Sequence, residues 1–264
     1  MKFNIFDGII DFINQKDKEL RDSTEEIKKL QTELKTLQNQ IQNATKETTV
    51  TPINKTHNFS REFLTKLSSL KETKDFDSVY QFFEELSSKG NREIISKACE
   101  EGLWKKTNKY GENVLHVASI NGNLNLVKSL IECDCDKEAK SDNGQTPLIY
   151  ASWEGHLEVV KYLISVGADK EAKTKNGWTS LIMASNYGRL EVVKYLISVG
   201  ADKEAKDNDG YTPLIFASYN GHLEVVKYLI SVGADKEAKT KNGGTVLSVA
   251  RDNVRNYLKS IGAK

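Results

Sequence analysis

Cysteine, proline and net charge are all scarce in this sequence of 264 residues. Its three cysteines, Cys99, Cys133 and Cys135, form no C-x-x-C pair, so a zinc site would lack its second pair of ligands. We expect no metal and no cofactor, and thiols held in a reducing compartment. The 38 basic and 37 acidic residues leave a formal net charge of +1, which gives no long-range attraction to nucleic acid. A nucleic-acid partner is therefore not expected.

Long hydrophobic runs are also missing. No stretch approaches the roughly 20 apolar residues that a membrane-spanning helix requires. The first residues, MKFNIFDGIIDFINQK, are interrupted by Asp7 and Asp11 and have no small-residue cleavage site, so they make a poor secretion signal. A cytoplasmic protein is the expectation.

The motifs that usually carry catalysis are absent as well. The sequence has no G-x-S-x-G, no G-x-x-x-x-G-K-[ST], no H-E-x-x-H and no G-x-G-x-x-G. Its four histidines are His57 in a polar segment, His116, and the pair His156 and His222 at predicted helix starts. No nucleophile is paired with a base, so we assign no catalytic residue and expect no enzyme.

Repetition is what the sequence has in abundance. The nineteen residues GHLEVVKYLISVGADKEAK at 155–173 return unchanged at 221–239, and with Arg189 in place of the histidine at 188–206. Five glycines recur every 33 residues, namely Gly111, Gly144, Gly177, Gly210 and Gly243. A fixed period of about 33 residues indicates a stack of supersecondary units rather than a single globule.

Each unit is predicted to hold two short antiparallel helices and a turn. In the second unit Thr146 is the N-cap, Pro147 is the first residue of the inner helix, and Gly155 ends that helix. Gly167 closes the outer helix, which carries four apolar residues at helical spacing: Leu157, Val160, Leu163 and Ile164. One unit is too small to bury its own apolar face, so the units must stack.

Thr-Pro-Leu, Gly-His-Leu-Glu-Val-Val and Gly-Ala-Asp at these spacings resemble ankyrin repeats, over residues 110–264. The resemblance implies an all-α helical solenoid of five repeats, with β-hairpin or loop fingers along one edge. The sequence departs from the family pattern in three ways. Ser180 replaces the helix-starting proline in the third unit. Asp134 replaces a C-cap glycine, which Asp tolerates in the left-handed region. The histidine after Thr-Pro-Leu remains only as His116, and its place is taken elsewhere by Ile149, Ile182, Ile215 and Ser248.

The last repeat is truncated, because it lacks four residues equivalent to 221–224. It ends in RDNVRNYLKSIGAK, whose polar outer face is what a solenoid cap requires. The DKEAK loops and the Glu–Lys pairs of the outer helices, such as Glu158 and Lys161, predict a solvated exterior.

The second, third and fourth repeats differ at only a few positions. One set, Tyr150, Met183 and Phe216, is expected to pack between helices. The others are rich in Trp and Tyr, which dominate binding hot spots, and the resemblance places them on the concave face and finger tips. We predict that they bind a protein partner: Gln145, Trp153, Glu154, Trp178, Asn186, Tyr187, Tyr211, Tyr219 and Asn220. The alternative is that the aromatic residues only stack along the array.

The sequence before the repeats divides into three segments. Residues 1–45 contain an a/d heptad pattern over 20–44, which predicts a short coiled coil and a homo-oligomer. A helix packed on its own chain and a partly disordered arm are the alternatives. Residues 46–60 form a polar linker, and residues 61–109 an all-helical N-terminal cap in which Trp104 packs. ACEEG at 98–102 resembles the end of an ankyrin inner helix.

These features predict a non-catalytic protein-interaction module or scaffold that binds partners on the concave face. One alternative is a stoichiometric inhibitor whose groove covers the active site of another enzyme. Another is a scaffold tethered to a membrane through residues 1–15, although their polar face is not basic and membrane docking is therefore not expected.

Overall fold

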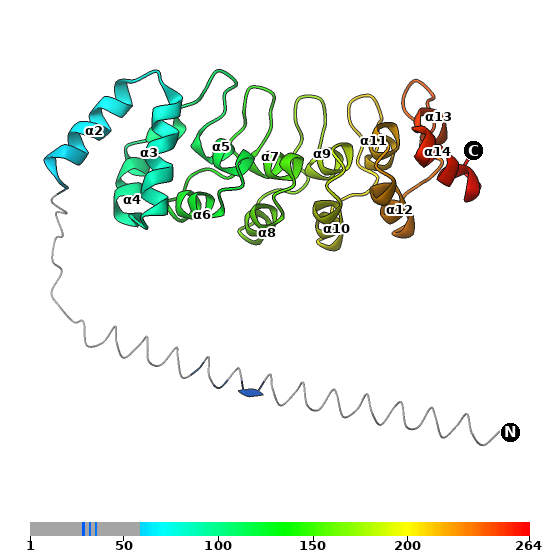
Figure 1. Ribbon diagram of the computed structural model, residues 1–264, viewed down its shortest axis with the longest axis horizontal. Coiled ribbons are helices and arrows are strands. Elements are labelled where there is room, and N and C mark those ends of the chain that lie inside the picture. The colour runs from blue at the N-terminus through cyan, green and yellow to red at the C-terminus, as the bar shows by residue number, and fades with distance from the viewer. Residues whose placement is uncertain (1–27, 30–31, 33–34, 36–58) are drawn as a thin grey trace. The chain divides into compact units, whose positions relative to one another are not determined.

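The computed structural model describes residues 28–29, 32, 35 and 59–264 (Figure 1). Of the predicted coiled coil, only four residues fall within this part of the chain, and all four are helical. The heptad pattern as a whole, residues 1–15 and nearly all of the linker lie outside the described residues.

Two rows of short helices run along Ser60–Lys264 (Figure 1). The inner row is α5 (Val114–Ile120), α7 (Pro147–Glu154), α9 (Ser180–Asn186), α11 (Pro213–Asn220) and α13 (Val246–Val249). The outer row is α6 (Leu124–Glu132), α8 (Leu157–Ser165), α10 (Leu190–Ser198), α12 (Leu223–Ser231) and α14 (Asp252–Ser260). Each inner helix packs on the outer helix that follows it and on its neighbours in the inner row. The predicted all-α solenoid is confirmed.

Stacking buries the same positions in successive repeats. Val160, Val193 and Val226 of the outer helices are 0% exposed, and Leu163, Leu196 and Leu229 are equally buried. Burial of one such side chain stabilises the fold by about 2 kcal/mol. One continuous core therefore joins the repeats.

The ends of the helices follow the sequence closely. Thr146 Oγ1 accepts a hydrogen bond from the Ile149 N–H at 3.3 Å, and Thr179, Thr212 and Thr245 cap their helices in the same way. Gly155 ends α7 with φ of 88°. Asp134 has φ of 56° and is the only non-glycine at positive φ among the described residues, as its place in the repeat predicted.

The fingers are the loops that lead from each outer helix to the next inner helix. They are closed by tight turns around the five repeated glycines, and no strand is assigned within Ser60–Lys264 beyond a single bridge between Lys239 and Thr245. Each finger is joined to the next by one backbone hydrogen bond, for example from the Lys175 N–H to the Asn143 carbonyl at 3.0 Å. The fingers therefore form a regular row of loops.

The glutamates of the DKEAK loops lie at the partly exposed surface, and they also join neighbouring repeats. Glu171 Oε1 accepts a hydrogen bond from the Asp202 N–H of the next repeat at 3.0 Å. Glu138 and Glu204 make the equivalent bond to Asp169 and Asp235. The prediction of a solvated exterior holds for the Glu–Lys pairs of the outer helices, which are exposed.

A second set of contacts joins the repeats at the C-terminal ends of the inner helices. His156 Nε2 lies 2.8 Å from the Ile120 carbonyl, and His222 Nε2 lies 2.9 Å from the Asn186 carbonyl. Arg189 Nε donates to the equivalent carbonyl of Trp153 at 2.8 Å. The last carbonyls of a helix have no partner within it. Arginine can replace histidine here because either side chain supplies one N–H to the same acceptor.

The segment of residues 61–109 extends both rows. It forms α2 (Arg61–Glu72), α3 (Phe76–Ser88), α4 (Arg92–Glu100) and the 3₁₀ helix η1 (Leu103–Lys105). Helix α3 contacts α5 and α6, whereas α4 contacts α6, so α4 begins the outer row (Figure 1). The prediction that residues 98–102 close an inner helix is therefore wrong. Trp104 is buried, as predicted.

All three cysteines meet where α4 packs on the first repeat. Cys99 Sγ lies 3.6 Å from Cys135 Sγ, and both residues are buried as free thiols. Cys133 is half-buried, and burial raises the pKa of its thiol to about 11. The Cys133 thiol is therefore protonated near neutral pH, and the buried Cys99 and Cys135 pack as small apolar groups.

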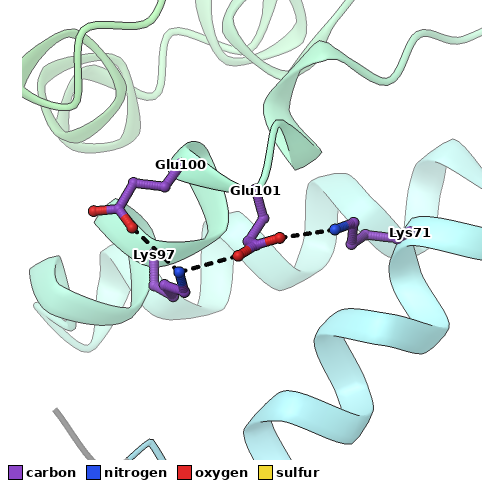
Figure 2. Close-up of polar contacts among 4 residues, drawn as sticks. All are labelled: Lys71, Lys97, Glu100 and Glu101. Carbon is purple, nitrogen blue, oxygen red and sulfur yellow. Dashed lines mark hydrogen bonds and ion pairs between the residues drawn. The ribbon is translucent and has the colours of Figure 1, made fainter. Parts of the chain in front are cut away.

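Exposed ion pairs join α2 to α4 (Figure 2). Lys71 Nζ of α2 lies 2.8 Å from Glu101 Oε2, and Lys97 Nζ of α4 lies 3.0 Å from Glu101 Oε1. Hydrogen bonds from Lys71 and Lys97, together with their charges, lower the pKa of Glu101 to about 2. Helix α2 also buries Leu67 and Leu70.

Replacement of Gly188 by alanine should destabilise the repeats more than the same change at Gly200. Both glycines have positive φ, 69° and 78°, which costs alanine about 1 kcal/mol. A Cβ at Gly188 would also lie 2.6 Å from His222 Nδ1, whereas at Gly200 it meets nothing within 4 Å. We expect the free energy of unfolding of G188A, measured in urea, to fall by about 1 kcal/mol more than that of G200A. Equal midpoints for the two variants would show that the His222 contact contributes nothing.

Replacement of Glu101 by glutamine should remove a pH-dependent part of the stability. Because the folded pKa lies below the ordinary value of 4.5, the ion pairs stabilise the fold above about pH 4.5. That stabilisation is lost as the pH falls toward 2. Melting temperatures of wild type and E101Q should therefore differ near neutral pH and converge at about pH 2. E100Q is the control, because Glu100 pairs with Lys97 on its own helix and does not reach α2. If the wild type still had the higher melting temperature at about pH 2, the stabilisation could not come from the ion pairs of Glu101.

Candidate functional site

Three recesses follow one another where the fingers meet the inner helices. The first recess, about 240 Å³, is lined by Asn143, Gln145, Trp153, Asn176, Trp178 and Tyr187, among others. The middle recess, about 440 Å³, includes Trp178, Asp207, Asp209, Tyr211, Phe216 and Tyr219. The terminal recess, about 570 Å³, includes Tyr219, Arg251 and Arg255. Trp178 lines the first and middle recesses and Tyr219 lines the middle and terminal ones, so the three recesses form one groove.

The structure brings together six of the residues predicted from sequence. They line the first two recesses: Gln145, Trp153, Trp178, Tyr187, Tyr211 and Tyr219. The other three, Glu154, Asn186 and Asn220, lie at the ends of inner helices and line none of these recesses. Whether any of the nine binds a partner stays a prediction.

The three residues outside the recesses have structural contacts. Asn220 Nδ2 donates to Asn186 Oδ1 at 2.8 Å, across the step from one repeat to the next. Glu154 Oε2 lies 4.0 Å from Arg189 Nη2. These contacts give the three side chains partners within the chain itself.

One aromatic stack runs from α7 of the second repeat into the first recess. The rings of Tyr150 and Trp153 stack with centroids 6.1 Å apart, and Trp153 lies 5.2 Å from Tyr187. Tyr150 Oη donates to Glu112 Oε1 at 2.6 Å, and burial together with this hydrogen bond raises the pKa of Tyr150. The stack is therefore anchored by a protonated phenol.

His116 stands behind this stack, with its ring 5.7 Å from that of Tyr150. Burial lowers the pKa of His116, which favours a neutral ring. Its Nδ1 accepts from the Asn113 N–H at 3.1 Å, so the proton lies on Nε2, which donates to the Ala139 carbonyl at 2.9 Å. His116 is therefore a structural residue. In three of the later repeats a fully buried isoleucine takes its place, as expected.

A second aromatic cluster lines the middle recess. Phe216 lies 4.6 Å from Trp178 and 5.0 Å from Tyr211, measured between ring centroids. Trp178 Nε1 also donates to Asp207 Oδ2 at 3.2 Å. The expected packing role of Tyr150, Met183 and Phe216 is confirmed, since these side chains are buried.

Stacking along the array therefore accounts for part of the aromatic content. Trp153, Trp178 and Tyr211 are half-buried in ring contacts. Two tyrosines stay largely in solvent, since Tyr187 is 39% and Tyr219 is 56% exposed. These two are the aromatic residues of the groove that are most available to a partner.

The finger residues of the groove were not anticipated. Asn143, Asn176 and Asp209 each precede a finger glycine, where polar residues are ordinarily explained by turn formation. Within the described chain the side chains of Asn143 and Asn176 have no hydrogen-bond partner, and both residues are exposed. The sequence did contain a signal for the finger residues. Asp207 and Asp209 are acidic, whereas the equivalent residues of the other repeats are neutral.

Two kinds of feature are absent from the described residues. No helix among them is both long and apolar enough to cross a membrane. No group of three His, Cys, Asp or Glu side chains in residues 28–29, 32, 35 and 59–264 is placed to hold a metal ion.

The chain belongs to the ankyrin repeat family. The family model described as ankyrin repeats, three copies, matches residues 84–174 and 166–240, which is more than half of the chain. The match begins inside α3, earlier than the resemblance at residue 110 suggested. No curated protein matches the chain. Ankyrin repeats are generally protein–protein interaction modules.

Truncation of a stacked tryptophan should cost more stability than truncation of an exposed tyrosine in the same groove. Trp153 contacts two neighbouring rings, so W153A should lower the free energy of unfolding by about 2 kcal/mol. Y219A should change it by less than about 0.5 kcal/mol, since Tyr219 is mostly exposed. Urea unfolding followed by circular dichroism compares the two. Equal losses would show that the stack does not support the fold.

Proposed function

We propose that this protein is a non-catalytic interaction module that binds a partner protein in the groove between its fingers and inner helices. The observation that carries the proposal is the pair of exposed tyrosines, Tyr187 and Tyr219, on a half-buried aromatic base. Rigid aromatic side chains supply contact area at a low entropic cost.

The surroundings of the tyrosines support the same proposal. The exposed amides of Asn143 and Asn176 can donate to and accept from the main chain of a bound segment. Half-buried tryptophans next to polar finger tips resemble the core and rim of a protein interface. Because α7, α9 and α11 are locked in one core, the groove needs little reorganisation on binding.

The remaining proposals concern the oligomeric state of the protein, its location in the cell and its domain boundaries. Residues 20–44 support a short coiled coil, which would join two grooves and raise the apparent affinity for a partner with two binding segments. Three free cysteines fit a reducing compartment, which supports a cytoplasmic location. Residues 46–60 are proposed as the linker and residues 61–109 as the helical cap, before the repeat domain at 110–264.

Site-specific photocrosslinking tests the groove directly. A benzophenone amino acid in place of Tyr219 should crosslink a defined set of proteins in native cell extract, because Tyr219 lies in the groove and is exposed. The matched control places the same amino acid at Glu191, on the exposed side of the outer helix α10. Crosslinked proteins are identified by mass spectrometry.

Two outcomes separate the alternatives. Proteins that are crosslinked from position 219 and not from 191 support the groove. The same proteins crosslinked from both positions, or from 191 alone, would place the binding surface on the outer helices and overturn the proposal.

A further inference from the structure

The middle recess combines aromatic walls with negative charge. Four aromatic residues line it, together with two aspartates and two asparagines, and no lysine or arginine is among them. The aromatic residues are Trp178, Tyr211, Phe216 and Tyr219. An aromatic ring presents a negative face, so both the rings and the carboxylates favour a positive charge in this space.

The finger turn of the fourth repeat does not require a carboxylate at position 207. Its Oδ1 accepts from the Tyr211 N–H at 2.8 Å, which closes the finger turn. Ser141, Thr174 and Thr240 close the equivalent turns with a neutral hydroxyl. A hydroxyl is therefore sufficient, and the finger of the fourth repeat has a carboxylate where the other fingers do not.

Asp207 is also a buried charge without a countercharge. The residue is 9% exposed, and its acceptors are filled by neutral donors, the N–H groups of Asp209 and Tyr211 and the indole of Trp178. Within the described chain it forms no ion pair with a basic side chain. With no cationic partner of its own, this carboxylate favours a cation that a ligand brings into the recess.

Asp209 places a second carboxylate at the mouth of the same recess. The equivalent residues of the other fingers are neutral, Asn143, Asn176 and Asn242. Asp209 is exposed, and its carboxylate has no partner among the described residues. Lys175 and Lys241 stand on the neighbouring fingers but form no ion pair with it.

We propose that the middle recess binds a cationic side chain, an arginine or a lysine, of the partner protein. The cation lies against the faces of Trp178 and Tyr219, and Asp209 accepts a charge-assisted hydrogen bond from it. This inference rests on the proposed function and names the chemistry that the groove recognises.

Nuclear magnetic resonance titration of the full chain tests the inference with small probes. The probes are N-acetyl-arginine N-methylamide, the lysine equivalent, and the citrulline equivalent, which has the shape of arginine without the charge. The reporter is the indole N–H of Trp178, which donates to Asp207, and a Trp178→Phe variant assigns its resonance. The other two tryptophans are internal controls, since Trp104 is buried and Trp153 lines only the first recess.

We expect a saturable shift of the Trp178 signal with arginine or lysine and none with citrulline. A preference for one cation identifies the residue type. D207T/D209N should weaken this binding about tenfold or more. Both changes introduce residues that the other fingers already use, so the variant should fold. E158Q/E191Q is the charge-matched control, because it removes two carboxylates from the outer helices and should bind like wild type.

Several results would overturn the inference. They are the absence of a saturable shift with either cation, an equal shift with citrulline, or unchanged binding by D207T/D209N. A failure here is distinct from a failure of the proposed function. If photocrosslinking from position 219 still succeeds, the groove binds protein without recognising a cation in its middle recess.

Discussion

Each helix pair of this protein has an apolar face that only another helix pair can cover. Val160, Val193 and Val226 are fully buried because each packs in an array whose next unit has the same shape. A change at one such position must fit the neighbours on both sides. This constraint explains why the chain carries the same nineteen residues twice, and a third time with one substitution. The core of a solenoid is one packing solution used repeatedly.

The polar groups of the array follow the same logic. A histidine or an arginine reaches the last carbonyls of the preceding inner helix, and a glutamate of each DKEAK loop reaches a backbone N–H of the next repeat. These bonds satisfy backbone groups that a lone helix pair would leave open. The ends of the array need different solutions. Helices α3 and α4 cover one end, and the polar helix α14 closes the other.

The positions that are free of this constraint carry the variation. Backbone hydrogen bonds join each finger to the next, and the side-chain contacts between fingers, such as the bond from Trp178 to Asp207, differ from one repeat to another. The groove that they form with the inner helices is uneven. Its first part is aromatic and amide-rich, its middle carries Asp207 and Asp209, and its last part holds Arg251 and Arg255. A nearly uniform scaffold thus presents a non-uniform binding surface.

The sequence alone determined the repeat period, the helix boundaries and the family, because N-caps, glycine turns and apolar spacing are local signals repeated in phase. It also marked Trp178, Tyr211 and Tyr219 as variable and aromatic. Only the tertiary structure decided that α4 opens the outer row, that the glutamates of the loops brace neighbouring repeats, and that Asn186 and Asn220 pair with each other. These outcomes depend on contacts between residues more than thirty positions apart in the sequence. Only the stacking of the repeats brings such residues close together in space. For the same reason the meeting of Asp207 with the aromatic walls was visible only once the repeats were assembled.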